Sequence, residues 1–302
     1  ILLHARSRED DARARLARAG DALLAQPTAA RTTDWHRARR AWRLAQLELA
    51  DLGDRRDDIP AITAALRADH REWPAALRAT DLDERDEAAA AYYEALRRSF
   101  AGDPAALDLY LANERRFDAL LEAQPYDAWA LYRGAWNSFD AFADASRQMR
   151  DAEAARLIRK TGAIVERLLA VDPQDHAARS LATNVREGLA QSLRDEGRFA
   201  EAIALQQRVV AQRRRELAAG ERSSMGLGNA GFSLAILGII SRDAGQRQRA
   251  CASFTEAEAL FAEAAAREEL LGFQARMHAG LMDKKAACAA GGPITGPLMR
   301  LE

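Results

Sequence analysis

The spacing of proline constrains the fold of this chain more than any other sequence feature. Eight prolines occur in 302 residues, and none lies between Pro173 and Pro293. The intervening stretch is rich in Ala, Leu, Arg and Glu, which lose little conformational freedom in a helix. Short breakers such as Gly102–Asp103–Pro104 and Gln124–Pro125 punctuate the rest. The sequence therefore predicts an all-α chain.

Amphipathic spacing between the breakers predicts twelve helices. Their expected ranges are 7–25, 34–52, 60–70, 83–100, 104–123, 127–150, 151–171, 175–196, 199–219, 224–243, 247–272 and 273–290. Asp103 before Pro104 predicts a helix N-cap followed by proline at the first helical position. Residues 291–302 are rich in Gly and Pro, and we expect them to form a flexible tail.

Residues 234–257 carry the spacing of a helix-pair repeat. The motif consists of Leu234, Leu237, Gly238, Gly245, Ala250, Phe254 and Ala257. Gly238 allows the two helices to approach closely, Gly245 ends the first helix, and Phe254 fills the gap beside Ala250. A second copy comprises Leu189, Ala190, Gly197, Phe199, Ala202, Ile203 and Val209.

This motif resembles the tetratricopeptide repeat (TPR), and the chain resembles the TPR regions that follow kinase or DNA-binding domains in bacterial regulatory proteins. The resemblance covers residues 104–290, is strongest over 186–270, and implies a right-handed α-solenoid of antiparallel helix pairs. Gly197 and Gly245 are 48 residues apart, whereas the standard repeat has about 34 residues. Residues 1–103 match poorly, and we expect divergent repeats or an N-terminal capping bundle there.

The resemblance implies a non-catalytic scaffold with a protein or peptide as its partner, without a cofactor and in a cytoplasmic signalling protein. A curved helical array leaves a long concave face free for binding. Two alternatives stay open. One is a regulatory domain that senses a small effector in a pocket lined by aromatic side chains. The other is a helical enzyme, which would need titratable groups that converge in a cleft.

An aromatic series recurs every three or four residues along the helix expected at 127–150. It comprises Tyr126, Trp129, Tyr132, Trp136, Phe139 and Phe142. Core packing is one interpretation, and aromatic anchors in the concave groove are the other. The candidate partner-binding residues are Tyr126, Trp129, Tyr132, Arg133 and Trp136. We expect Trp129 or Tyr132 to be partly exposed, and Arg133 suggests an extended peptide or an apolar effector with an acidic group.

Several motifs are expected to have structural roles. Gly226, Gly228 and Gly231 form a GxGxxG pattern, but no strand precedes it, so we predict no nucleotide binding. The segment from Ser223 to Ser241 contains no charge, and we expect a buried first helix rather than a membrane span. The histidines are scattered and no HExxH occurs, which indicates no metal site, and no catalytic residue is assigned. A formal net charge of −1 argues against nucleic acid as a partner.

A basic cluster lies on and before the helix expected at 34–52. It comprises Arg31, His36, Arg37, Arg39, Arg40 and Arg43. We expect it to pair with the acidic run Asp81, Asp83, Glu84, Asp86 and Glu87; binding of a phosphate or an acidic peptide is the alternative. The two cysteines, Cys251 and Cys288, are too few for a disulfide framework and fit a reducing compartment.

Overall fold

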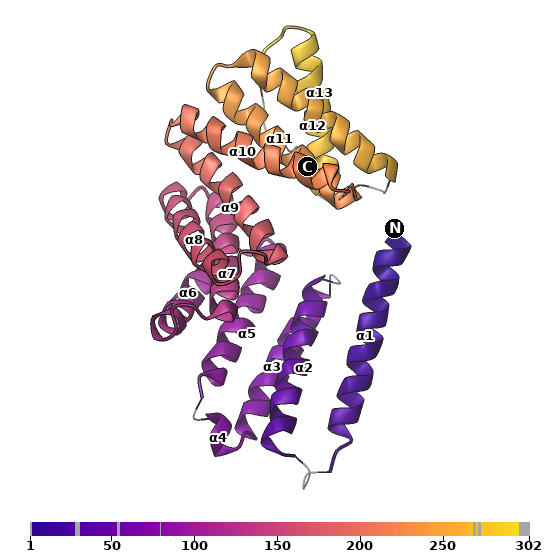
Figure 1. The fold of residues 1–302 in the computed structure, drawn as a ribbon, viewed down its shortest axis with the longest axis vertical. Helices are drawn as coiled ribbons and strands as arrows, with labels where there is room; N and C mark the ends of the chain where they lie inside the picture. The colour runs from indigo at the N-terminus through magenta and orange to yellow at the C-terminus, as the bar shows by residue number, and fades with distance from the viewer. Residues whose placement is uncertain are drawn as a thin grey trace. The chain divides into compact units, whose positions relative to one another are not determined.

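The computed structural model describes residues 2–27, 31–52, 55–78, 80–220, 222–267, 270 and 273–295 (Figure 1). All regular secondary structure in these residues is helical, with thirteen α-helices and one short 3₁₀ turn. The chain divides into two compact units, residues 1–175 and residues 176–302. The prediction of an all-α chain is confirmed.

The first unit contains eight α-helices. Their bounds are α1 (Leu2–Leu24), α2 (Thr33–Leu52), α3 (Ile59–Arg71), α4 (Ala75–Arg78), α5 (Leu82–Phe100), α6 (Ala106–Ala123), α7 (Ala128–Arg147) and α8 (Asp151–Val171). The one-turn helix α4 and the 3₁₀ turn Arg56–Asp58 were not predicted. Helix α6 begins at Ala106 with Ala105 as its N-cap, so the prediction of Asp103 as the N-cap and Pro104 as the first helical residue is wrong. The Asp103 carboxylate instead accepts the N–H of Ala105 at 2.9 Å, in the turn before the helix.

The second unit contains five α-helices. Their bounds are α9 (His176–Asp195), α10 (Phe199–Ala218), α11 (Ser224–Asp243), α12 (Arg247–Arg267) and α13 (Phe273–Ala289). Helix α12 ends at Arg267, before the end predicted at residue 272. Residues 268, 269, 271 and 272, and residues 296–302 of the predicted tail, lie outside the described residues.

One helix-ending turn recurs along the whole chain. A backbone N–H just beyond a helix donates to the carbonyl five residues earlier, the bond of a Schellman motif. The donor–acceptor pairs are Arg55–Ala50, Asp103–Arg98, Arg150–Ala145, Arg198–Leu193, Gln246–Ser241 and Gly292–Ala287. Successive donors are 46 to 48 residues apart. The residue before the donor is left-handed at Gly102, Met149, Gly197, Gly245 and Gly291. The chain therefore repeats a helix pair about every 48 residues.

The second helices of four pairs share one buried face in a strict 48-residue register. Equivalent positions are Ala106, Ala154, Ala202 and Ala250; Tyr110, Ile158, Gln206 and Phe254; Asn113, Thr161, Val209 and Ala257; and Phe117, Val165, Arg213 and Phe261. All sixteen are buried. Their spacing of four, seven and eleven residues places them on one side of a helix.

Polar residues in this register bond to a neighbouring first helix. Asn113 Nδ2 donates to the carbonyl of Ala88 on α5 at 2.9 Å. Gln206 Nε2 donates to the carbonyl of Ser233 on α11 at 2.8 Å. Each bond satisfies an amide N–H, while Asn113 Oδ1 and Gln206 Oε1 have no hydrogen-bond partner among the described residues. The register therefore includes polar side chains that are partly satisfied.

Within each unit, most helices pack against the next helix of the chain, and the first helices also pack against one another. In residues 1–175, α5 contacts both α2 and α7, and in residues 176–302, α11 contacts both α9 and α13. The first helices of each unit therefore form a shared layer, with the second helices packed against it. The site described below lies on this layer in the first unit.

Helix α11 is the central helix of the second unit. Among the described helices it alone is long and apolar enough to cross a membrane, with a mean hydropathy of 1.4 and 72% of that window buried. A core helix has the same properties. Its glycines admit aromatic rings, because a Cβ on Gly238 would lie 2.5 Å from Phe254 and one on Gly231 would lie 2.9 Å from Phe261. These contacts support the packing role expected for the glycines.

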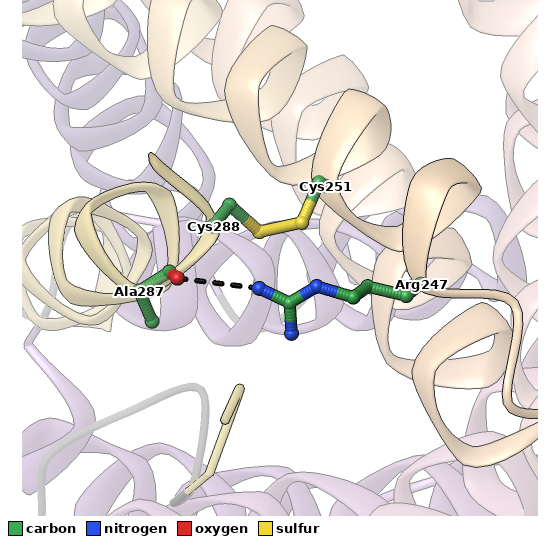
Figure 2. The surroundings of a disulfide bond; sticks show 4 residues. All are labelled: Arg247, Cys251, Ala287 and Cys288. Atoms are coloured by element: carbon green, nitrogen blue, oxygen red, sulfur yellow. Dashed lines mark hydrogen bonds between the residues drawn. A yellow bond between two sulfur atoms is a disulfide. The ribbon is translucent and has the colours of Figure 1, made fainter. Parts of the chain in front are cut away.

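A disulfide joins the last two helices. Cys251 of α12 and Cys288 of α13 are bonded, with their Cα atoms 5.6 Å apart (Figure 2). One turn before Cys251, Arg247 Nη2 donates to the carbonyl of Ala287 at 3.4 Å. The disulfide was not predicted from the sequence. The pairing removes the cysteine argument for a reducing compartment, and the cytoplasmic location stays a prediction.

The basic cluster on α2 is held by two buried carboxylates. Arg40 Nε pairs with Asp86 Oδ1 at 2.7 Å, as expected from the acidic run. Arg43 pairs instead with Asp69 of α3 at 3.2 Å, as Arg39 does with a shorter bond. Asp86 also binds Nε2 of His70 at 2.9 Å. The cluster is therefore compensated largely within the first unit, through α3 as well as α5.

Candidate functional site

A hollow of about 350 Å³ opens between α2, α5 and α7 on the first-helix layer of residues 1–175. We call it the α2–α5–α7 pocket. Its lining residues are Glu48 and Asp51 of α2, Tyr92 and Tyr93 of α5, and Tyr132, Arg133 and Trp136 of α7. Three first helices of successive pairs thus contribute to one surface.

Aromatic rings form most of the pocket wall. Tyr92 and Tyr93 lie edge to face, with ring centroids 5.1 Å apart and planes at 68°. Tyr132 and Trp136 are four residues apart on α7, which places them on the same face of that helix. The Trp136 ring is supported edge-on by Phe139 at 5.9 Å. Tyr132 and Trp136 are partly exposed, so part of each side chain is accessible to a ligand.

The single arginine of the wall is already bound by its neighbours. Arg133 Nη1 donates to the Tyr93 hydroxyl at 3.0 Å, and Nη2 pairs with the Glu48 carboxylate. Its guanidinium lies 5.6 Å from the Tyr93 ring centroid and 5.8 Å from that of Tyr132. Burial lowers the pKa of Arg133, and Glu48 compensates its charge. Arg133 therefore ties α7 to α2 and α5.

Carboxylates lie at the edge of the pocket and behind its wall. The Glu48 side chain is 50% exposed and pairs with Arg133, and Asp51 forms an ion pair with Arg56, whose Nε donates to it at 2.9 Å. Behind the wall, the Tyr92 hydroxyl donates to Asp140 Oδ2 at 2.9 Å. Burial raises the pKa of Asp140 to about 7, and the nearby Asp51 carboxylate acts in the same direction. The pocket therefore presents acidic oxygens beside aromatic faces.

Such a combination is suited to a cationic group. An ammonium or guanidinium over an aromatic face gains about 0.5–2 kcal/mol, more when it is desolvated. A carboxylate at the rim adds a charge-assisted hydrogen bond. Burial raises the pKa of Tyr93, so its hydroxyl stays neutral. In the part of the chain that the structure describes, no group of three or more His, Cys, Asp or Glu could hold a metal ion.

The structure brings three of the five candidate residues together. Tyr132, Arg133 and Trp136 line the pocket, while Tyr126 lies just before α7 with 69% of its surface exposed. Trp129 is partly exposed outside the pocket, with its ring 6.1 Å from that of Phe117. Partial exposure of Trp129 and Tyr132 agrees with the expectation from the sequence.

Sequence reasoning missed the four lining residues that come from α2 and α5. The adjacent pair Tyr92–Tyr93 follows a run of four alanines, and two large rings in a small-residue helix were an available signal. Glu48 and Asp51 gave no signal, because charges near the end of an amphipathic helix are common. Only the packing of α2 beside α5 places them at a pocket.

No family model matches the chain, and no curated protein or solved structure does either. The pocket's own residues are therefore the basis for assigning a function.

Proposed function

We propose that the chain is a non-catalytic, protein- or peptide-binding scaffold whose α2–α5–α7 pocket takes a basic side chain of its partner. The observation that carries this proposal is the set of four aromatic rings bordered by Glu48 and Asp51. A lysine or arginine side chain of the partner meets π-faces along its stem and carboxylate oxygens at its charged end.

The charges of the residues that line the pocket determine whether the bound group of the partner is acidic or basic. The sequence suggested an acidic group on the ligand, because Arg133 lies among the aromatics. Arg133 is occupied by Glu48 and the Tyr93 hydroxyl, so an incoming carboxylate would have to displace Glu48 and lie near Asp51. A basic group leaves the Glu48–Arg133 pair in place and adds a positive charge beside two carboxylates, each of which is already paired with one arginine, Glu48 with Arg133 and Asp51 with Arg56.

A small cationic effector is the second candidate, and the size of the pocket favours it. About 350 Å³ lies at the lower end of the range of small-molecule sites, roughly 300–1,000 Å³. The same volume holds one long side chain of a peptide. The two functions differ in whether the residues that flank the basic side chain add to the affinity. The experiment below measures this difference.

The proposed architecture is a right-handed α-solenoid of TPR-like helix pairs. The recurrent Schellman turns, the shared register of the second helices and the contacts between successive first helices support it. The period near 48 residues is longer than the roughly 34 residues of a standard repeat. By resemblance alone, we propose that the chain is the interaction part of a larger bacterial regulatory protein in the cytoplasm, without a cofactor, nucleic acid or membrane as its partner.

Fluorescence polarisation with labelled peptides tests the function. The probes are an arginine- and lysine-containing peptide, the same peptide with glutamines at the basic positions, and one with glutamates there. We expect the basic peptide to bind most tightly, and Asp51→Asn and Tyr132→Ala each to weaken it about 5- to 30-fold, as loss of one such contact does.

Two matched variants control for general effects of the substitutions. Asp108→Asn removes an exposed carboxylate of α6, and Tyr126→Ala removes an exposed ring outside the pocket. Both should bind like the wild type. Equal affinity for the three peptides would refute the proposal, as would a loss on Tyr126→Ala equal to that on Tyr132→Ala. Binding of N-acetyl-arginine amide as tightly as the whole peptide would favour the small effector.

A further inference from the structure

A second surface, in residues 176–302, has the opposite chemistry. Two adjoining hollows of about 370 Å³ and about 280 Å³ lie along α9 and α10 and share Gln212. Arg179 of α9 lines the larger hollow. Arg186 of α9 lines the smaller one, together with Arg208 and Arg215 of α10. We call this surface the α9–α10 groove.

The four arginines lie in two rows that face one groove. Arg179 and Arg186 are seven residues apart on α9, and Arg208 and Arg215 are seven residues apart on α10. Seven residues are nearly two helical turns, so each row lies on one helix face with about 10 Å between its members. All four side chains are exposed. Because α10 runs back along α9, the groove presents positive charge along its length.

These arginines lack the carboxylate partners that other arginines of the unit have. Among the residues that the structure describes, no carboxylate of the second unit forms an ion pair with any of the four, which are Arg179, Arg186, Arg208 and Arg215. Arg215 donates to the neutral Gln212 at 2.6 Å. By contrast, ion pairs with carboxylates are made by Arg198, Arg214, Arg222, Arg242 and Arg267. The positive charge of the groove is therefore available to a ligand.

The only carboxylate that lines the two hollows, among the residues described, is bound within the groove. Glu216 accepts hydrogen bonds from Gln212 Nε2 at 2.9 Å and from Arg213 Nη1 at 3.2 Å. The Arg213 side chain is 8% exposed, and its second bond goes to Asn184 at 2.9 Å. Glu216 thus does not cancel the charge of the four exposed arginines.

The larger hollow ends at the start of α11. Ser223 and Gly226 line it, and Ser223 Oγ accepts the N–H of Gly226 at 3.0 Å as the helix cap. A helix N-terminus carries partial positive charge. The Nε of the buried Arg213, which lines the same hollow, has no hydrogen-bond partner among the described residues. Helix end and guanidinium together favour an anionic group at this end.

We propose that the α9–α10 groove binds an acidic segment of a partner protein, with side-chain carboxylates on Arg186, Arg208 and Arg215 and a further carboxylate beside Arg179 at the start of α11. Arginine pairs with carboxylates in a bidentate geometry. Apolar side chains also line the two hollows, including Leu205 and the 70%-exposed Met225. An acidic peptide with apolar residues between its carboxylates therefore matches the groove.

The same features disfavour nucleic acid as the ligand. Proteins that bind DNA through its backbone typically neutralise about six to ten phosphates, and the groove offers four exposed arginines. The two hollows admit side chains, and the apolar residues between the arginines have no counterpart in a phosphate backbone. Nucleic acid is nevertheless an outcome that the experiment separates.

Fluorescence polarisation on the full chain tests the proposal with three labelled probes. They are a twelve-residue peptide in which glutamates alternate with leucines and serines, its all-glutamine counterpart, and a single-stranded DNA of twelve nucleotides. We expect the acidic peptide to bind most tightly, and to weaken as salt rises from about 50 to about 300 mM, because the pairs are exposed.

Charge reversal locates the binding surface. Arg186→Glu and Arg208→Glu should each weaken binding of the acidic peptide at least about 10-fold, and Arg276→Glu, an exposed arginine of α13, should leave it unchanged. Arg208→Gln should give a smaller loss of affinity for the acidic peptide. This variant keeps the test valid if a charge-reversal substitution unfolds the second unit. Equal binding of the acidic and all-glutamine peptides, tighter binding of the DNA, or an equal loss on Arg276→Glu would overturn the proposal.

Discussion

Gly238→Ala is the substitution for which the structure gives the sharpest expectation. A Cβ at this position would lie 2.5, 2.7 and 2.9 Å from three ring atoms of Phe254. Carbon atoms in proteins prefer separations of about 3.5–4.0 Å, so the ring would have to move by roughly 1 Å. Phe254 is fully buried in the core of the second unit, where close packing resists such a shift.

Two opposing effects set the size of the change. Adding a methyl group to a packed core costs about 1–3 kcal/mol. Replacing glycine by alanine within a helix returns about 1 kcal/mol of helix propensity. We therefore expect Gly238→Ala to lower the free energy of unfolding by up to about 2 kcal/mol. Gly134→Ala on α7 is the matched control, because its nearest contact, Phe117 Cβ at 3.3 Å, needs little adjustment.

Urea unfolding followed by far-UV circular dichroism measures the effect, and a double-mutant cycle assigns it. In a Phe254→Leu background, a smaller side chain faces the new methyl group, and Gly238→Ala should then cost at least about 1 kcal/mol less than in the wild type. If Gly238→Ala leaves stability unchanged or raises it, and Phe254→Leu does not alter the result, then α12 does not pack against α11 as described.

Three further predictions follow from individual residues. Met149, 85% exposed, has φ 54° where four other turns have Gly102, Gly197, Gly245 and Gly291. Met149→Gly should therefore raise the free energy of unfolding by about 0.5–1 kcal/mol in urea titrations, and a loss of stability would contradict the shared turn. Reduction of the Cys251–Cys288 disulfide, which closes a separation of 37 residues, should destabilise the second unit by about 3–4 kcal/mol in calorimetry with and without reductant. The pKa of Asp140 is raised from 3.8 to about 7, so the folded state binds the proton more tightly and the contribution of this group to stability is lost as pH rises from about 4 to 7. Asp140→Asn, which keeps an acceptor for Tyr92, should therefore gain stability relative to the wild type over that window by up to about 1.4 kcal/mol per pH unit, and parallel pH profiles would rule this out.

The helices were predictable because their signals are local. Apolar spacing and the breakers at Gly197 and Gly245 placed the helix ends of the second unit within one residue of those observed, except for the C-terminal end of α12. The helix α4, Ala75–Arg78, was missed because a single turn between prolines and charges leaves no periodic pattern. The disulfide was missed because only the packing of α12 on α13 brings the two sulfurs together.

The strict repeat was hidden by polar residues at core positions. Gln206 and Arg213 occupy positions that are apolar in the α12 copy, Phe254 and Phe261. In the structure Gln206 donates to the carbonyl of Ser233 and Arg213 donates to Asn184, but hydrophobicity alone scores both as surface residues. A search of the sequence for helix-ending glycines about 48 residues apart would have found the register.

The candidate site was predictable only along α7. Tyr132, Arg133 and Trp136 share one helix, so their spacing alone grouped them. Asp51 and Tyr93 come from helices far apart in sequence. Their side chains changed the expected charge of the ligand from negative to positive. A site built across three helices needs the packing of those helices before its charge can be assigned.

A crystal structure of the chain with the basic peptide tests the central claim most directly. The account predicts an arginine or lysine side chain of the peptide in the α2–α5–α7 pocket, against the rings of Tyr132 and Trp136, with its charged end within about 3 Å of the Asp51 or Glu48 carboxylate. A peptide bound elsewhere with this pocket empty, or an acidic side chain in the pocket paired with Arg133, would contradict it.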